Sequence, residues 1–307
     1  MSLIQDARTK LHRDLIAQEI FCYCPLSAAD QKKYAQPWIA SNADSGQKSS
    51  CQIGNGLLAM MESKTGLSAI VQKQKPKGQT LGNAFESLCA SFLQDTFPYL
   101  AHLRPGHWQI AKSASRASGV IGQYEQYSHL AELDRLAEAH AELRNFLGDG
   151  YTIAPDVVIA RLPETDEQIN QSHAIVDPDN ARNSMLRSAN HADPQSPSAL
   201  LHASISCKFT MRSDRSQNTR TEALNLIRSR KGRVPHIVAV TAEPMPARIA
   251  SLAIGTGDID CVYHVALYEL KQCLEQLDRD DLVDSLNSMI EGKRLKDISD
   301  LPLDLAI

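Results

Sequence analysis

A change from strand to helix between residues 200 and 233 constrains the fold of this chain more than any other feature. Apolar side chains alternate with small or polar ones from Leu201 to Cys207, which is the period of a β-strand. From about Arg212 the apolar residues instead recur at helical spacing. Of the 26 residues from Lys208 to Arg233, eight are basic and two are acidic, so this segment carries a charge of +6 in a chain of net charge −4. The pattern predicts a strand followed by a basic helix whose face is either solvated or binds a partner.

Composition is that of an ordinary soluble globular protein, with 43% hydrophobic and 22% charged residues among 307. No run of 18 apolar residues predicts a membrane span, and the N-terminus lacks an apolar signal core. The seven cysteines include no CxxC pair, which argues against a disulfide framework or a zinc knuckle. We therefore expect a reduced, cytoplasmic protein. One domain is expected over 1–307, with a mobile insertion at about 163–199, where Pro, Asp, Asn and Ser dominate.

Helical and strand patterns alternate along the rest of the chain. Helices are predicted at 2–20, 53–61, 81–99 and 124–147, and over two leucine-rich segments between 267 and 290, whereas 41–50 is predicted to be a loop. Strands are predicted at 107–111, 157–159, 200–208, 236–242 and 260–264. Strands that alternate with helices indicate an α/β layered fold.

Four chemically suited residues are candidates for one site. Asp156 follows a proline and opens a buried strand, Lys208 ends another strand, and Glu86 and Glu222 lie on predicted helices. Carboxylates that hold Mg²⁺ lower the pKa of bound water and neutralise charge on phosphate oxygens. A lysine beside the metal orients the attacking water and stabilises the transition state. This arrangement is typical of phosphodiester hydrolysis.

The spacing of these residues follows the PD-(D/E)xK nuclease pattern with one departure. Ser206 stands where the acid two residues before Lys208 is expected, so Glu222 is the natural replacement carboxylate. The motif is degenerate, because Pro-Asp occurs by chance in most proteins of this size. On spacing alone, a nuclease site and a coincidental arrangement of solvated carboxylates both stay open.

The segment Arg212-Ser213-Asp214-Arg215 lies where the helical spacing begins. Arginine pairs bidentately with guanine O6 and N7, and an acidic side chain accepts from cytosine N4, so the segment is chemically matched to a CC/GG half-site. An Asp that caps the helix and forms a salt bridge with an arginine is the structural alternative.

These motifs together resemble the NgoMIV-type type II restriction endonucleases. The resemblance extends beyond the motifs to four segments, 78–89, 202–244, 255–270 and 292–306, and it weakens at about 21–50 and 163–199. It implies a restriction-endonuclease-like core, with a mixed central β-sheet flanked by helices. It also implies double-stranded DNA as substrate, two Mg²⁺ ions per active site, a homotetramer that binds two DNA sites, and a cognate methyltransferase that protects host DNA.

The resemblance also implies roles for individual residues. Asp156 would bridge the metal ions, the main-chain carbonyl of Cys207 would be a ligand, and Glu222 would complete the site with support from Glu86. Ser206 occupies the position of the motif's acid. Bases would be read by Arg212, Asp214 and Arg215 within CCGG, and by Gln79 and Ser45 at its flanks.

The expected activity is Mg²⁺-dependent double-strand cutting at a palindromic CCGG-containing site. The resemblance implies GCCGGC, cut before the first C to leave a 5′ CCGG overhang. Two alternatives are a PD-(D/E)xK nuclease of other specificity and a catalytically silent sequence-specific DNA-binding protein. A nucleotide-driven enzyme is disfavoured because no GxxxxGK[ST] loop is present.

Overall fold

The computed structural model describes residues 2–113, 118–140, 142, 153–255 and 257–307. By its internal contacts the chain divides into two compact units. Unit 1 comprises residues 1–100, 205–220 and 237–307, and unit 2 comprises residues 101–204 and 221–236. A six-stranded sheet has the strand order β3-β4-β5-β6-β7-β8, and a two-stranded sheet pairs β1 with β2. Because β3 and β4 are antiparallel whereas β6, β7 and β8 are parallel, the larger sheet is mixed, as predicted.

Unit 1 contains most of the helices. Its elements are α1 (Leu3–Ala17), β1 (Tyr23–Pro25), α2 (Ala28–Tyr34), β2 (Trp38–Ala40), α3 (Lys48–Thr65), α4 (Gly78–Gln94), η1 (Phe97–Leu100), β6 (His236–Thr241), α9 (Pro246–Ala253), β7 (Cys261–His264), α10 (Leu267–Gln276), α11 (Asp280–Glu291), β8 (Leu295–Asp297), η5 (Ile298–Asp300) and α12 (Leu301–Asp304), together with the last residues of β5 (Leu200–Lys208) and the first of α8 (Ser213–Ser229). The first residue of β6 belongs to unit 2.

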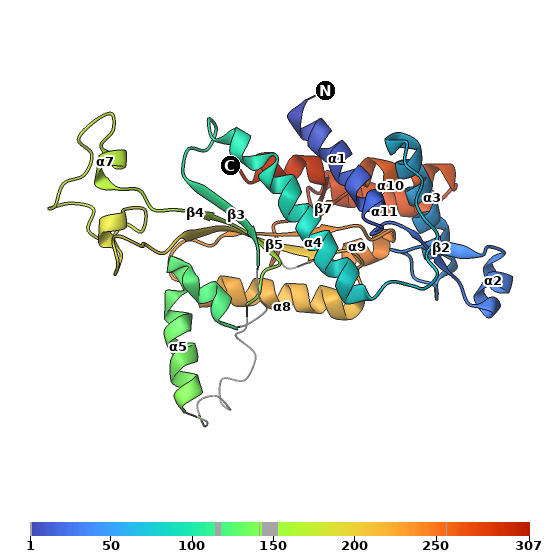
Figure 1. The fold of residues 1–307 in the computed structure, drawn as a ribbon, viewed down its shortest axis with the longest axis horizontal. Coiled ribbons are helices and arrows are strands. Elements are labelled where there is room, and N and C mark those ends of the chain that lie inside the picture. The colour runs from blue at the N-terminus through green and yellow to red at the C-terminus, as the bar shows by residue number, and fades with distance from the viewer. Residues whose placement is uncertain (1, 114–117, 141, 143–152, 256) are drawn as a thin grey trace. The chain divides into compact units, whose positions relative to one another are not determined.

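Helices α1, α3 and α4 of unit 1 are drawn in Figure 1, and an apolar stripe along α4 packs into the core. On α4 the stripe of Leu81, Phe85, Leu88 and Phe92 is buried, because residues three and four apart share one helix face. Helix α1 packs against α3 and α4, and α3 packs against α10. Helix α3 ends at Gly66, whose φ of 70° is a left-handed conformation that favours glycine.

A buried arginine joins three elements of unit 1. The Arg8 side chain on α1 donates to Asp297 with Nε and Nη2, each at 2.8 Å. It also donates to Glu269 on α10 with Nη1 at 3.0 Å and Nη2 at 2.6 Å. All three side chains are buried. Burial raises the pKa of Glu269, but the hydrogen bonds and charge of Arg8, with His12 and Lys64, outweigh this and hold the pKa at about 2.

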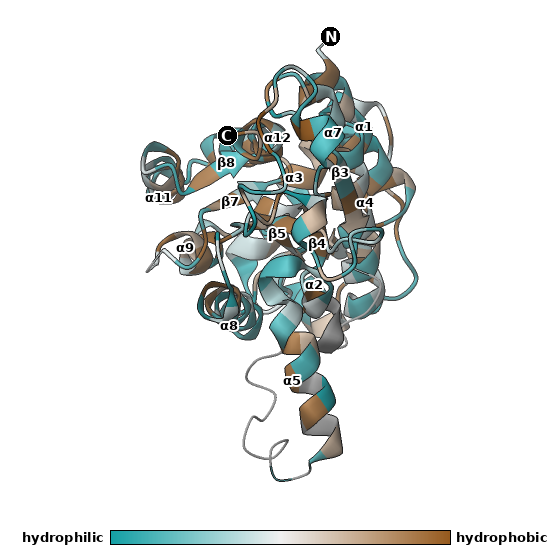
Figure 2. Cartoon of the chain, turned by 90° about the vertical axis from the view of Figure 1, so that its left-hand side faces the viewer, coloured by the Kyte–Doolittle hydropathy of each residue, from teal (hydrophilic) through white to brown (hydrophobic). Residues whose placement is uncertain are grey.

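Unit 2 contains the other strands and the less regular segments. Its elements are β3 (Trp108–Lys112), η2 (Ser118–Gln123), η3 (Glu125–Tyr127), α5 (Ser128–Ala139), β4 (Val157–Arg161), α7 (Asp166–Ile169) and η4 (Ser188–Asn190), with the remaining residues of β5 and α8. In Figure 2, hydrophobic and hydrophilic residues alternate along α5, as expected of an amphipathic helix. The Tyr127 hydroxyl donates to the carbonyl of Leu226 at 3.0 Å, which fixes η3 against α8.

Between 163 and 199 the chain forms α7 and η4, and a buried arginine links the parts of this segment. Arg187 donates to Asp166 with Nε and Nη2, each at 2.6 Å, and to the carbonyl of Asn180 at 2.7 Å. The expectation that this insertion is mobile stays a prediction, as does the expectation of a single domain.

The predicted strand and helix at 200–233 are confirmed as β5 and α8. The predicted helix over 53–61 is too short, since α3 begins at Lys48, and the helix over 81–99 stops at Gln94. The helix predicted over 124–147 starts later than predicted, since α5 begins at Ser128 after η3, and most of 140–152 lies outside the described residues. All seven cysteines lie among the described residues, where they are buried and form no disulfide bond. Among the described residues, no helix combines the length and apolarity that crossing a membrane requires.

Candidate functional site

Two predicted carboxylates lie at one short segment of unit 2. Glu222, on α8, accepts a hydrogen bond from the Ala154 backbone N–H to its Oε1 at 2.9 Å. Asp156 follows two residues later and is 6% exposed. Its own carbonyl accepts from the Ser113 N–H at 2.9 Å, which secures the backbone just before β4. The fold of unit 2 therefore brings Glu222 to the backbone that carries Asp156, although 65 residues separate them in sequence.

The end of β5 carries three predicted residues of unit 1. Side chains alternate across a strand, so Ser206 and Lys208 share one face and Cys207 points to the other. The Ser206 and Thr219 hydroxyls lie 3.3 Å apart, and the Lys208 carbonyl accepts from the Thr241 hydroxyl at 2.7 Å. Cys207 is buried, and the proposed ligation through its main-chain carbonyl stays a prediction.

Gln79 and Glu86 lie on one face of α4. They are seven residues apart, which is close to two helical turns. Gln79, in the first turn, is exposed, whereas Glu86 is 5% exposed. One helix therefore presents an amide to solvent and buries a carboxylate two turns later.

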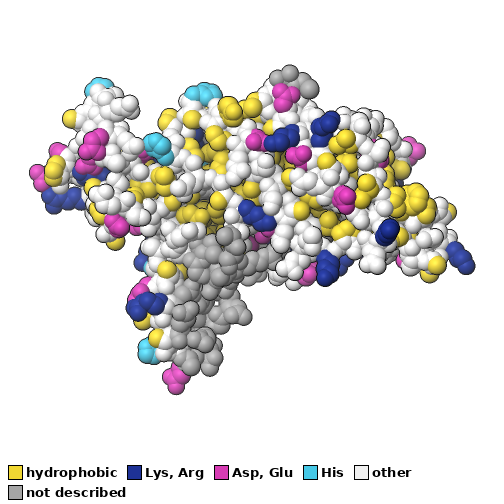
Figure 3. All heavy atoms as spheres, in the orientation of Figure 1, with side chains coloured by type: hydrophobic (Ala, Val, Ile, Leu, Met, Phe, Trp, Pro, Cys, Tyr) yellow, Lys and Arg dark blue, Asp and Glu magenta, His cyan; other side chains and the backbone are white. Residues whose placement is uncertain are grey.

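Unit 1 contains a cavity of about 370 Å³, which we call the arginine pocket. Its lining includes the exposed Arg212 and the partly buried Arg215 and Arg248. The other lining residues are Ser41, Asn42, Ala43, Asp44, Lys75, Pro76, Gly78, Leu81, Phe209 and Thr210. Three arginines and a lysine against one aspartate make this pocket cationic. By contrast, basic and acidic side chains are interspersed on the face drawn in Figure 3.

The two arginines of the predicted reading segment are held differently. The Arg215 guanidinium donates to the Thr210 hydroxyl at 2.8 Å and to the Thr210 carbonyl at 3.2 Å. Within the described residues, no hydrogen bond to the Arg212 guanidinium is found. Asp214 lies in the first turn of α8, is exposed, and forms no ion pair with any residue that the structure describes. The alternative in which Asp214 serves a structural salt bridge is therefore not observed.

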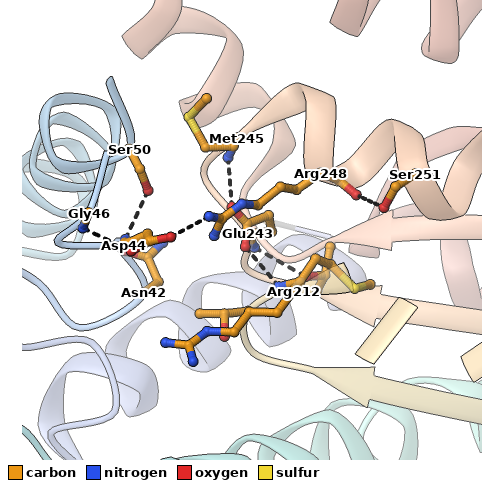
Figure 4. A network of polar contacts seen from close by, with 12 residues as sticks. Asn42, Asp44, Gly46, Ser50, Arg212, Glu243, Met245, Arg248 and Ser251 are labelled. Atoms are coloured by element: carbon orange, nitrogen blue, oxygen red, sulfur yellow. Dashed lines mark hydrogen bonds and ion pairs between the residues drawn. The ribbon is translucent and has the colours of Figure 1, made fainter. Parts of the chain in front are cut away.

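A second set of charged residues lies beside Arg212 (Figure 4). Arg248, on α9, forms an ion pair with Asp44, and its Nη1 lies 3.9 Å from Oε1 of Glu243. The hydrogen bond from Arg248 holds the pKa of Asp44 below its usual range, helped by the Gly46 backbone N–H. Glu243 is fully buried, and burial raises its pKa to about 7. Its carboxylate accepts from the backbone N–H of Met211 at 2.7 Å and of Met245 at 3.1 Å.

The sequence interpretation missed Asp44, Glu243 and Arg248, which belong to no recognisable motif. It selected Ser45 instead, whose carbonyl accepts from the Tyr34 hydroxyl at 2.8 Å and whose neighbour Asp44 lines the pocket. Gln79 is likewise next to the lining residue Gly78. One available signal was the position of Glu243 two residues after the buried strand β6.

The donor chemistry of the predicted metal ligands suits Mg²⁺, which prefers oxygen ligands. Two carboxylates and a main-chain carbonyl are predicted, from Asp156, Glu222 and Cys207. In the described parts of the chain, no group of three or more His, Cys, Asp and Glu residues is placed to hold a metal ion. The predicted ligand set contains only two such side chains, Asp156 and Glu222, and is therefore smaller than a group of three.

Comparison with known proteins assigns the family. The model of the NgoMIV restriction enzyme family matches residues 11–307. The type II restriction enzyme NgoMIV of Neisseria gonorrhoeae is 50% identical over 269 residues, which are 88% of this chain and 90% of that protein. The residues matched by the family model include β5, α8 and the arginine pocket. The chain therefore belongs to the NgoMIV restriction enzyme family and is a type II restriction endonuclease.

Proposed function

We propose that this enzyme makes Mg²⁺-dependent double-strand cuts at a palindromic CCGG-containing DNA site. The observation that carries the catalytic part is the hydrogen bond from Ala154 to Glu222, because it holds Glu222 at the segment that carries Asp156. Type II restriction enzymes in general use a divalent metal ion, and carboxylate oxygens are its usual ligands. Two Mg²⁺ ions per active site are part of the proposal.

In the proposed reaction, water attacks the scissile phosphate in line and leaves a 5′-phosphate. Asp156, Glu222 and the carbonyl of Cys207 would hold the metal, which supplies positive charge and acidifies bound water. Lys208 orients the attacking water and places positive charge beside the phosphate, where negative charge develops. Glu86 supports the arrangement from α4, and Ser206 takes the position of the motif's acid.

The arginine pocket is proposed to read the bases. Arg212 and Arg215 each suit one guanine of the GG step, and Asp214 suits the amino groups of the opposite cytosines. The hydrogen bonds from Arg215 to Thr210 support this role, because a guanidinium that is already oriented loses less freedom on binding. Since the ion pair of Asp44 and Arg248 lines the same pocket, we add both residues to the set that contacts DNA.

The base pairs outside CCGG are proposed to be read near Gln79 and Ser45, and the complete site is proposed to be GCCGGC, cut before the first C. We further propose a homotetramer that binds two DNA sites, a cognate methyltransferase that protects host DNA, and a cytoplasmic location. The seven cysteines, all of which are described and none of which forms a disulfide bond, support a reducing compartment.

Mapping the cut ends tests this function. The purified enzyme is incubated with a plasmid of known sequence and Mg²⁺, and the ends are sequenced. We expect 5′-phosphate ends with CCGG overhangs at GCCGGC. Cuts without a shared sequence would indicate a nuclease of other specificity, and binding without cleavage would indicate a catalytically silent protein.

A matched pair of variants distinguishes the site from a contaminating nuclease. Asp156→Asn should abolish cutting but keep binding, because removing an anion near phosphate lessens repulsion. Asp179→Asn makes the same chemical change in unit 2 at a carboxylate whose side chain is 91% exposed, and it should cut like the parent enzyme.

A further inference from the structure

We infer that Glu243 is a positioning residue for sequence reading, which holds Arg212 and Arg248 in the geometry that discriminates between DNA sites. This inference rests on the proposed function, since it concerns the pocket proposed to read bases. Glu243 lies outside the pocket lining and is fully buried, so it does not contact DNA itself.

The first contact fixes the backbone that carries Arg212. Oε2 of Glu243 accepts from the Met211 N–H at 2.7 Å, one residue before Arg212. The Arg212 carbonyl in turn accepts from the Ser216 N–H at 3.0 Å, so the residue is held on both sides. In Figure 4 the Arg212 side chain extends away from this network. A fixed backbone with an extended guanidinium is what a base-reading arginine requires.

The second contact concerns Arg248. The other oxygen of Glu243, Oε1, accepts from the Met245 N–H at 3.1 Å and lies 3.9 Å from Nη1 of Arg248. Met245 directly precedes α9, the helix that carries Arg248. The two oxygens of one carboxylate therefore fix the backbone beside each of two pocket arginines, which come from segments more than 30 residues apart.

Only an ionised carboxylate of this length fits both contacts. An amide has one acceptor oxygen, so Glu243→Gln would leave one buried backbone N–H facing the NH₂ group. Glu243→Asp keeps the charge, but its side chain is one methylene shorter and cannot reach both amides in the same backbone geometry. A buried donor without an acceptor is costly, so the backbone is expected to shift toward solvent or another acceptor.

The experiment measures discrimination, with Glu269→Gln as the matched control. Glu269 is also a buried carboxylate of unit 1, 1% exposed, but its partners are Arg8 and Lys64. Dissociation constants are measured for a cognate duplex and for duplexes with single substitutions in CCGG, without Mg²⁺ and at one salt concentration. Glu243→Gln should lower the ratio of altered to cognate constants at least tenfold. Glu269→Gln should lower Tm by as much or more and keep the ratio of the parent enzyme.

Catalysis supplies a second readout. In Glu243→Gln, KM for the cognate site should rise while kcat stays within about threefold of the parent, because metal ligation is untouched. If the Gln variant does not fold by circular dichroism, Glu243→Asp carries the same test, with a smaller loss expected. Parental discrimination in a folded Glu243 variant would overturn the inference. A parent enzyme that itself fails to discriminate would instead overturn the proposed function.

Discussion

Replacing Arg8 with methionine should cost the enzyme about 3–5 kcal/mol of unfolding free energy, the usual loss when one partner of a buried ion pair is removed. Arg8 is 5% exposed and makes four hydrogen bonds to two buried carboxylates. An independent figure comes from Glu269, whose pKa is about 2 instead of 4.5. At 1.36 kcal/mol for each pKa unit, this difference is worth about 3 kcal/mol, and Arg8 is the largest of the causes that lower the pKa.

The assay is urea unfolding followed by circular dichroism, together with a thermal scan. For a chain of 307 residues the expected loss corresponds to a decrease in Tm of about 5–8 °C. Lys10→Met is the control, because Lys10 also lies on α1 but pairs with Asp95 across an exposed 2.6 Å contact. An exposed pair is worth about 0–1 kcal/mol. Similar losses for Arg8→Met and Lys10→Met would refute the assignment of this network to fold stability.

The same pKa fixes the direction of the pH dependence. The folded-state pKa of Glu269 is lowered, so its contribution is fully present above about pH 4.5 and is lost as pH falls through about 2. The difference in stability between the parent and Arg8→Met should therefore shrink as pH is lowered through this range. A constant difference down to pH 2 would contradict the charge-based explanation.

Three further predictions concern function. As pH falls from 8 to 6, discrimination between DNA sites by the parent enzyme should decline, because Glu243 is protonated near pH 7 and a neutral carboxyl cannot accept fully from both amides. Asp44, with its lowered pKa, keeps its charge state over this range. His264, whose pKa burial lowers to about 4, also keeps its charge state. The raised pKa of Glu243 affects fold stability in the opposite direction: its contribution to stability is fully present below about pH 4.5 and is lost as pH rises through about 7. Arg212→Ala should cost about 1–3 kcal/mol of discrimination per half-site in the same binding panel, whereas Arg228→Ala should weaken binding to all sequences equally. A single-site plasmid should be cut slowly and faster when a cognate duplex is added in trans; a monomer by sedimentation without such stimulation would oppose the tetramer.

The long helices and strands could be predicted because the spacing of their apolar residues repeats with the period of a helix or of a strand. In β5 and α8 the spacing changes from two to helical within a few residues, and the predicted helix start at about Arg212 agrees with the structure. The strands β1, β2 and β8 were missed since each is three residues long, which is too short to show alternation. Helix α2 was missed because it lies in a polar segment and buries only Tyr34.

The residues of the candidate site also differ in how well the sequence predicts them. Asp156, Lys208 and Arg212 lie next to strong elements, so their position along the chain made them candidates, and the family resemblance supplied their roles. Glu243 and Arg248 were not selected because their proposed roles depend on contacts with Met211 and Asp44, which lie far away in sequence. Long-range ion pairs leave no periodic signal in one sequence.

The most direct test of the central claim is a double-mutant cycle on cleavage by Asp156→Asn, Glu222→Gln and the two combined. If both carboxylates hold the same metal, the double variant should be no more than about tenfold slower than either single variant, since residues that act as a unit show non-additive losses. Site-specific binding should survive in all three. Losses that multiply, or cleavage by Asp156→Asn within tenfold of the parent enzyme, would contradict the account.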